Sequence, residues 1–215
     1  MGDRIVAVST HGVVSLDAKA WDDAVTHTLD QLWNGDLAPR QLGTTAKLLW
    51  TNSHLYVRFQ CYYSELDVNN PLEVAELLRQ GRETYALWDR DVCEIFVRSP
   101  AERDEMKYHE FEAAPTGEWC DLRVDRRSMT HDWEWQSGMR VRTRINGELQ
   151  RWVALMEIPF SAFGAHPDHS EAPWYGNLFR VSRFEGERKY LAFSPTYAPQ
   201  PNYHVPEKFV VLQFR

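Results

Sequence analysis

The chain has 215 residues and a formal net charge of −7 at pH 7. This acidic balance argues against nucleic acid as a partner, because proteins that bind it concentrate Lys and Arg on one face. Charged residues make up 26% and hydrophobic residues 43%, close to the averages of soluble globular proteins, so the chain should fold. The length suits one domain, which we place at residues 1–215.

Aromatic residues reach 13%, with nine Trp and nine Tyr, which is more than a core alone requires. Such rings also stack on flat apolar faces of ligands. The three cysteines, Cys61, Cys93 and Cys120, include no C-x-x-C pair, so we expect buried free thiols. No apolar run resembles a signal peptide or a membrane span, and we expect a soluble protein without a membrane partner. Its location stays open: the cytoplasm as the sequence is written, or outside it if a leader has been removed.

The first half of the chain contains several strand patterns in order. Residues 4–8 predict a short strand, and residues 47–50 and 54–63 predict a hairpin across a Thr-Asn-Ser turn. Residues 71–80 predict one short helix, because proline opens the segment, apolar residues follow at helical spacing and glycine ends it. Residues 88–98 alternate apolar and polar side chains and predict a further strand.

The second half continues with paired strands. Residues 106–114 and 118–124 predict a hairpin across Pro-Thr-Gly, and residues 139–145 and 152–158 predict another across Asn-Gly. Strands at residues 177–184, 189–193 and 208–214 complete the set. About ten strands at this spacing predict an all-β protein, a single antiparallel β-sandwich of jelly-roll type.

The strand at residues 88–98 is the centre of the predicted site. Side chains alternate between the faces of a strand, so Cys93, Ile95 and Val97 share one face, which we expect to join the core. Glu94 lies on the other face, and Trp88 stands just before the strand. Trp88 has two interpretations, a ring that covers the core at the strand edge or one wall of a ligand site.

A second strand adds polar side chains to the same face. If the strands at residues 88–98 and 106–114 pair, then Tyr108, Glu110 and Glu112 share a face with Glu94. A ring beside carboxylates suits a sugar, because the ring covers the C–H face while the acids accept hydroxyl protons. We therefore predict a carbohydrate-binding face.

Catalysis by acidic pairs is the main alternative. Common catalytic motifs are absent from the sequence, and we assign no catalytic residue. Asp91, Glu94, Glu110 and Glu112 could serve a carbohydrate-active enzyme. However, residues 110 and 112 on one strand would lie about 6.5–7 Å apart on the same face. They would not straddle a scissile bond as glycosidases require.

These residues resemble a known family, the family 9 carbohydrate-binding modules and their DOMON-like relatives. Trp88 and the downstream Glu94 are similar to the tryptophan strand of the family, and residues 108–112 with Gly117 resemble the strand that follows. Further similar segments follow in the order of the family, at residues 48–50, 55–57, 152–154, 157–160, 177–180, 194–196 and 203–209. The resemblance covers almost the whole chain.

The resemblance implies a β-sandwich that grips the end of a mono- or oligosaccharide between two aromatic rings. Trp88 would be one ring and Phe193, where the family has tryptophan, the other. Glu94 would accept a sugar hydroxyl, and Arg180 at the end of the 177–180 match joins the candidate ligand residues. Glu112 stands where the family can have arginine, which puts a glucose-type preference in question.

The resemblance also bears on cofactors. Structural calcium is known in the family and stays open for this chain, although no acidic cluster in the sequence maps onto such a site, and we expect no required cofactor. A DOMON-type haem or redox domain is a further alternative, for which Met106 and His204 are the candidate axial ligands.

Overall fold

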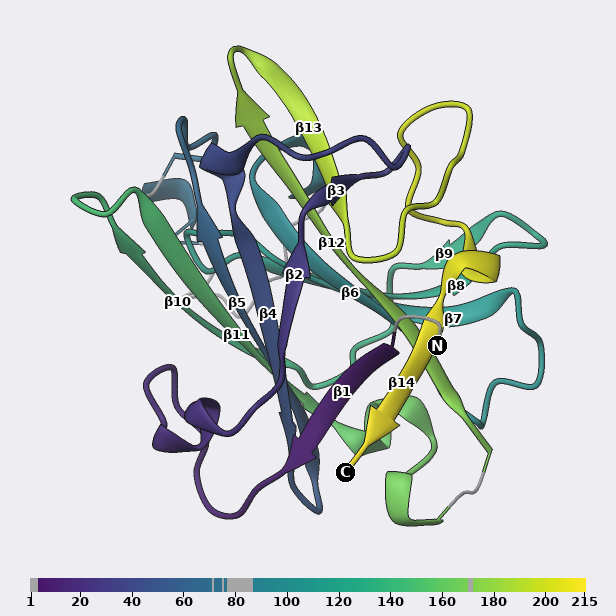
Figure 1. Ribbon diagram of the computed structural model, residues 1–215. Coiled ribbons are helices and arrows are strands. Elements are labelled where there is room, and N and C mark those ends of the chain that lie inside the picture. Colours follow the sequence, from purple (N-terminus) through teal and green to yellow (C-terminus); the bar gives the residue numbers. More distant parts are fainter. Residues whose placement is uncertain (1–3, 71, 75, 77–86, 170–171) are drawn as a thin grey trace.

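The structure is a computed structural model that describes residues 4–70, 72–74, 76, 87–169 and 172–215. The described residues form fourteen strands that belong to one curled sheet (Figure 1). The strands are β1 (Arg4–Ser9), β2 (Thr26–Leu29), β3 (Gln31–Leu32), β4 (Thr44–Trp50), β5 (His54–Tyr62), β6 (Val92–Arg98), β7 (Lys107–Ala113), β8 (Trp119–Asp125), β9 (Thr130–Asp132), β10 (Arg140–Asn146), β11 (Arg151–Pro159), β12 (Trp174–Phe184), β13 (Glu187–Ala192) and β14 (Val210–Phe214).

Short 3₁₀ turns connect some of these strands. They are η1 (Lys19–Asp22), η2 (Arg40–Leu42), η3 (Leu87–Asp89), η4 (Phe160–Phe163), η5 (Pro167–His169) and η6 (Pro206–Lys208). Residues 72–74 and 76 are helical, and the rest of the helix predicted near residues 71–80 lies outside the described residues. None of the helical segments in the described ranges combines the length and the apolar character needed to span a bilayer.

The all-β prediction is confirmed, with three short strands added. β2, β3 and β9 have only two to four residues each, too few for an alternating pattern to be recognised. The three predicted hairpins form as β4–β5, β7–β8 and β10–β11. In the last of these, Asn146 pairs with Arg151, so residues 147–150 make a four-residue connection rather than the predicted two-residue turn.

Strand order along the sheet is β10-β11-β5-β4-β1-β14-β12-β6-β7-β8-β9. Most neighbours are antiparallel as predicted, but β1 is parallel to both β4 and β14. The two strands nearest the chain ends thus lie side by side and join the two arms of the sheet (Figure 1). The pairing partner of an end strand is a long-range choice that its own sequence does not contain.

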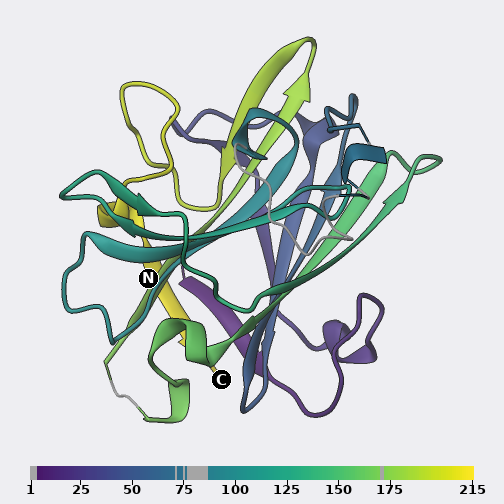
Figure 2. The same cartoon turned by 180° about the vertical axis from the view of Figure 1, so that it is seen from behind.

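The two arms of the sheet pack against each other around the main core (Figures 1 and 2). One arm is β10, β11, β5 and β4, and the other is β12, β6, β7 and β8. Cys93, Ile95 and Val97 face this core, as their alternation predicts, and all three cysteines are buried and form no disulfide among the described residues. Rings from both arms contribute, including Phe59, Phe111 and Trp152.

The other face of β6, β7, β8 and β12 is also covered. A second apolar cluster there joins Phe96 and Tyr108 to Phe179 and to Tyr203 and Phe209 of the segment after β13. The sequence pattern separates the two faces of β6, but it does not predict that the segment after β13 packs over the second face. The pocket described below lies on this second face.

Candidate functional site

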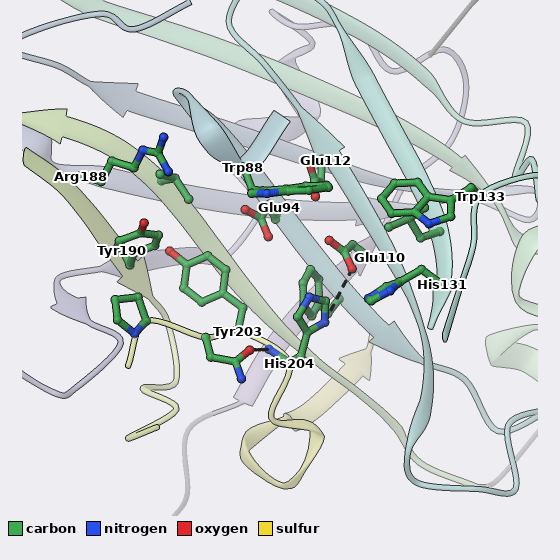
Figure 3. Close-up of a pocket in the computed structure, with 15 residues that line it drawn as sticks. Trp88, Glu94, Glu110, Glu112, His131, Trp133, Arg188, Tyr190, Tyr203 and His204 are labelled. Atoms are coloured by element: carbon green, nitrogen blue, oxygen red, sulfur yellow. Dashed lines mark hydrogen bonds and ion pairs between the residues drawn. The ribbon is translucent and has the colours of Figure 1, made fainter. Parts of the chain in front are cut away.

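A cavity of about 310 Å³ opens on the second face, between the β6–β7 ladder and the segment after β13 (Figure 3). We call it the acidic pocket. Its floor is made by β6 and β7, and its walls come from η3, from the chain around β9, from β13 and from residues 201–204. Leu122 of β8 and Val181 of β12 also line it, so segments far apart in the sequence enclose one small space.

Three carboxylates form the floor. Glu94 on β6 is paired across the ladder with Glu112 on β7, and Glu110 precedes Glu112 by two residues, so all three project on one face. Each offers an oxygen within 4.8 Å of the others, closer than the strand spacing of Glu110 and Glu112 suggests. We call Glu94, Glu110 and Glu112 the glutamate cluster. Their exposed fractions are only 2%, 3% and 0%.

Burial dominates the electrostatics of the cluster. Loss of hydration raises the pKa of Glu94 well above its ordinary value, and the nearby charge of Glu112 raises it further. The pKa of Glu110 is raised by the same two causes. Burial raises the pKa of Glu112 to about 7. The cluster therefore exchanges protons near neutral pH, and full ionisation is costly.

The cluster also has few partners. Among the described residues, no group outside the cluster donates a hydrogen bond to Glu94 Oε1, Glu110 Oε2 or either carboxylate oxygen of Glu112, although Glu110 and Glu112 contact each other. Outside the cluster, His204 Nδ1 lies 3.9 Å from Glu110 Oε2 (Figure 3). Buried polar atoms are normally satisfied, so these oxygens point to a ligand that supplies the missing partners.

Aromatic rings wall the pocket above the carboxylates. Trp88 on η3 is 39% exposed, and its ring lies 5.9 Å from that of Trp133 at 42°, so the two form one bent surface. Tyr203 stacks on Phe179 at 4.1 Å and meets Tyr190 edge to face at 6.2 Å. The pocket thus has broad apolar faces beside polar oxygens (Figure 3).

Two histidines line the opening, His131 on β9 and His204. His204 Nδ1 lies 2.7 Å from the hydroxyl of Tyr108, which supports the ring from below. Burial lowers the pKa of His204 to about 4 and also lowers that of His131. Both imidazoles are therefore neutral at pH 7 and do not balance the charge of the glutamates.

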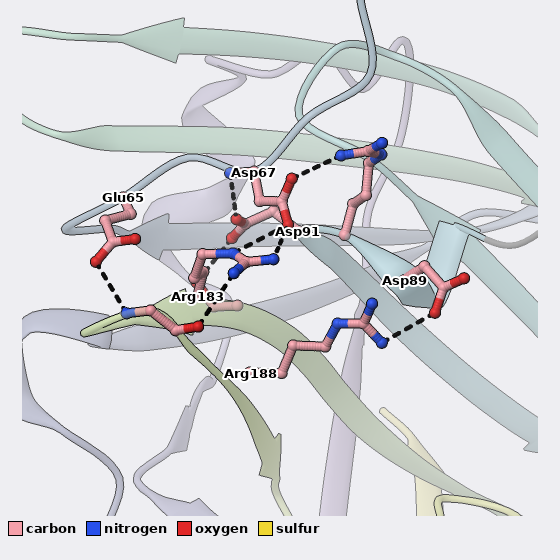
Figure 4. A network of polar contacts seen from close by, with 9 residues as sticks. Glu65, Asp67, Asp89, Asp91, Arg183 and Arg188 are labelled. Carbon is pink, nitrogen blue, oxygen red and sulfur yellow. Dashed lines mark hydrogen bonds and ion pairs between the residues drawn. The ribbon is translucent and has the colours of Figure 1, made fainter.

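Ion pairs position the turn that carries Trp88 (Figure 4). Asp67 binds Arg90 at 2.7 Å and Arg183 at 2.8 Å, which joins the loop after β5 to the start of β6 and to β12. Arg188 of β13 binds Asp89 of η3 at 2.9 Å. η3 is thus held from two sides beside the pocket mouth.

The structure brings together most of the predicted site residues. Trp88, Glu94, Glu110 and Glu112 line one pocket, as the shared face predicts. Tyr108 lies on the same side but is buried behind His204, with its ring 1% exposed. It supports the pocket wall and does not line the cavity.

Arg180 does not lie in the pocket. It neighbours Phe179 and Val181 on β12, whose side chains face the pocket side, so alternation turns Arg180 to the main core. There its guanidinium is fully buried, donates to Leu42 O and Thr44 Oγ1, and lies 3.6 Å from Asp91. The candidate role of Arg180 as a ligand residue is therefore corrected to a buried structural one.

Phe193 does not lie in the pocket either. Its ring packs against the main core and meets His27 edge to face at 5.4 Å. Tyr190, three residues earlier, falls on the opposite side and lines the pocket. The segment named for the second ring thus contributes Tyr190 and not Phe193 to the pocket lining, because an odd spacing reverses the face.

The sequence interpretation missed several lining residues. Trp133 and Tyr203 lie outside regular strands, in segments whose path depends on the whole fold. The alternation of β13 could have favoured Tyr190 and Arg188. The closely spaced rings of His131, Trp133 and Trp135 were a weaker signal.

The glutamate cluster is the one group of possible metal ligands found in the described part of the chain. Calcium takes six to eight oxygen ligands in proteins. Three carboxylates would supply part of that shell, whereas most of the remaining wall is aromatic. The three carboxylates thus suit a cation, but they supply too few oxygen ligands to complete the shell of an isolated calcium ion.

The fold and pocket together define a β-sheet protein with a pocket on an outer sheet face. The sequence matches the carbohydrate family 9 binding domain-like family over residues 12–170, which is more than half of the chain. The chain therefore belongs to this family. No curated protein matches the sequence.

Solved structures share the fold at low sequence identity. A candidate carbohydrate-binding protein from Bacteroides uniformis is 18% identical with a TM-score of 0.73, and each chain is covered in full. A family 9 module from Caldicellulosiruptor kristjanssonii in complex with cellotriose is 13% identical with a TM-score of 0.69, covering 99% of this chain and 94% of that one. The same kind of module in complex with glucose is 14% identical with a TM-score of 0.69, covering 99% and 96%.

Proposed function

We propose that the chain is one non-catalytic binding module that holds a mono- or oligosaccharide in the acidic pocket. The observation that carries this proposal is a cavity of about 310 Å³ in which aromatic rings face buried carboxylates. Sugars present C–H faces and hydroxyl groups on one small ring, and this pocket offers a surface for each. The family, and the similar modules whose structures are in complex with cellotriose and glucose, support the same ligand class.

Trp88 should carry the stacking contact, because it is the most exposed ring of the pocket and joins Trp133 in one surface. We expect Trp88→Ala to weaken saccharide binding by about tenfold or more, the usual scale for removing a ring at the centre of a contact. Isothermal titration with glucose, cellotriose and a broader panel of neutral and charged oligosaccharides measures this.

Tyr62 on β5 gives a matched control, because it is 40% exposed, close to the 39% of Trp88, and does not line the pocket. Tyr62→Ala should bind as the parent does. Equal binding by Trp88→Ala and the parent would remove the pocket from the proposal, and a panel without any bound saccharide would remove the function.

The geometry does not favour glycoside hydrolysis. A hydrolase needs two carboxylates on opposite sides of the scissile bond. The glutamate cluster projects from two paired strands on one face, and Asp91 is buried against Arg180 instead. Turnover of glycosides that is lost in Glu94→Gln would contradict this part of the proposal.

The geometry does not favour haem binding through Met106 and His204 either. Only His204 lines the acidic pocket, and its Nδ1 already contacts the Tyr108 hydroxyl. A Soret band after haem addition that disappears in His204→Ala would argue for the haem alternative.

A further inference from the structure

The charge of the acidic pocket is not balanced by its own lining. Three buried carboxylates share the floor, and Arg188 is the only Lys or Arg among the described lining residues. That guanidinium is bound to Asp89 at 2.9 Å, on the rim. Since His131 and His204 are neutral at pH 7, the described lining holds no cation that is free to pair with the negative charge the cluster carries when it ionises.

The positions of the carboxylates add a geometric condition. One oxygen of each carboxylate lies within 4.8 Å of the other two, and several of their oxygens have no donor outside the cluster among the described residues. An ammonium group has three N–H donors and no acceptor, so one such group can donate to three carboxylates at once. A sugar hydroxyl donates a single proton and leaves the charge in place.

The walls favour the same kind of group. Trp88 and Trp133 present ring faces beside the floor (Figure 3), and aromatic faces attract cations. A cavity of about 310 Å³ is much larger than an ion and leaves room for the ring that would carry the amino group. Aromatic walls supply few of the further oxygens that calcium takes.

We propose that the acidic pocket selects a saccharide unit with a protonated amino group, which it seats on Glu94, Glu110 and Glu112. This inference rests on the proposed function and specifies its ligand class as amino sugars. The ammonium group of the bound sugar places a positive charge beside the buried carboxylates and donates N–H groups to their oxygens. N-acetylation of the amine removes the charge and two of the three donors, so the acetylated sugar should be rejected.

The test compares glucosamine, glucose and N-acetylglucosamine, with glucosamine oligomers, chitooligosaccharides and cellotriose as their longer forms. Isothermal titration of the full chain at pH 7 is run once with EDTA and once with calcium chloride. We expect the glucosamine forms to bind about tenfold or more tightly than the other two series in EDTA, the scale of a charge-assisted hydrogen bond.

Variants test the role of the carboxylates. Glu112→Gln and, separately, Glu94→Gln should each reduce the preference for glucosamine over glucose by about tenfold. Exposed Glu148 lies in the β10–β11 turn, outside the pocket, and Glu148→Gln should keep the parent's preference. Circular dichroism of each variant establishes that it is folded, and the comparison of ligands on the parent chain needs no variant.

The outcomes separate this inference from the proposed function. Equal affinity for the three series would overturn the amino-sugar preference and leave saccharide binding in place. Binding that requires calcium would also overturn it, because the carboxylates would then serve a metal ion. If neither neutral nor amino saccharides bind under either condition, both proposals fail.

Discussion

Two groups of buried acids lie close together around β6 and β7, and they differ in their partners. Asp91, just before β6, is 1% exposed and has a cation at 3.6 Å, the fully buried Arg180. It also accepts hydrogen bonds from Ser182 Oγ and the Asp67 backbone N–H. The glutamate cluster begins three residues later and has open oxygens and no such cation among the described lining residues.

The difference shows how the two faces are used. Burying a charge is costly unless it is paired and hydrogen-bonded, and Asp91 meets both conditions within the protein. The glutamate cluster meets neither condition. The free-energy cost of burying its carboxylates is therefore compensated by the stability of the rest of the fold or by a bound molecule. A buried acid with protein partners supports the architecture, whereas one without them indicates a binding site.

The largest effect should follow from breaking the paired group. Arg180→Met leaves Asp91 buried without its cation, and we expect a loss of about 3–5 kcal/mol in the free energy of unfolding. Urea denaturation followed by tryptophan fluorescence measures it. Arg123→Met is the matched control, because its pair with Asp132 is about half exposed (52% and 43%) and should contribute about 0–1 kcal/mol.

The double variant Asp91→Asn with Arg180→Met sharpens this test. Both charges are then gone, so the double variant should recover part of the stability that Arg180→Met loses. If the two substitutions instead lower the free energy of unfolding additively, the two side chains act independently.

Strand alternation made part of this comparison predictable from sequence. The pattern of β6 and β7 placed Glu94, Glu110 and Glu112 on one face, and the structure has them there. The same rule applied to β12 and β13 excludes Arg180 and favours Tyr190, but the family resemblance had directed attention to Arg180 and Phe193. A family resemblance identifies the matching segment, but an error of one residue within a strand moves the side chain to the opposite face of the sheet.

Other features depend on contacts that no local pattern contains. Trp133 and Tyr203 reach the pocket from segments after β8 and β13, and their positions follow from packing across the sheet. The parallel pairing of β1 with β4 and β14 joins segments far apart in the sequence. Because the sequence contains several strands of similar character, these pairings were not predictable from it.

The glutamate cluster should make the unliganded protein less stable as pH rises. Its carboxyls have pKa values raised by burial, with Glu112 at about 7, so the unfolded chain releases their protons first. Between the ordinary glutamate pKa and these raised values, the folded state binds more protons and loses stability as pH increases.

Histidines oppose this trend at lower pH. Burial lowers the pKa of His27 and His131, and lowers those of His109 and His204 to about 4. Because the unfolded chain binds protons to these histidines more readily, they destabilise the fold at low pH, and this cost disappears as pH rises to about 6.5. From about pH 6.5 to 7.5 the glutamate cluster therefore dominates the change, and the buried thiols of Cys61 and Cys93, whose pKa values are also raised, add to the decline only as pH approaches the ordinary thiol pKa.

Thermal and urea unfolding across that window should show a decline for the parent chain. Glu112→Gln should reduce the decline by about 1 kcal/mol, because Glu112 no longer ionises and no longer repels its neighbours. Glu148→Gln, on an exposed turn, should decline as the parent does. A steeper decline in Glu112→Gln than in the parent would contradict the assignment of the cluster as uncompensated.

The smallest effect should come from the ion pair on the pocket rim. Asp89 and Arg188 are 56% and 38% exposed, so solvent screens their attraction, in contrast to the buried Asp91 and Arg180. We expect Asp89→Asn to change the free energy of unfolding by only a few tenths of a kcal/mol, measured by urea denaturation at low and high salt. A loss as large as that of Arg180→Met would mean that η3 depends on this one contact, and that the distinction between buried and exposed pairs does not hold in this fold.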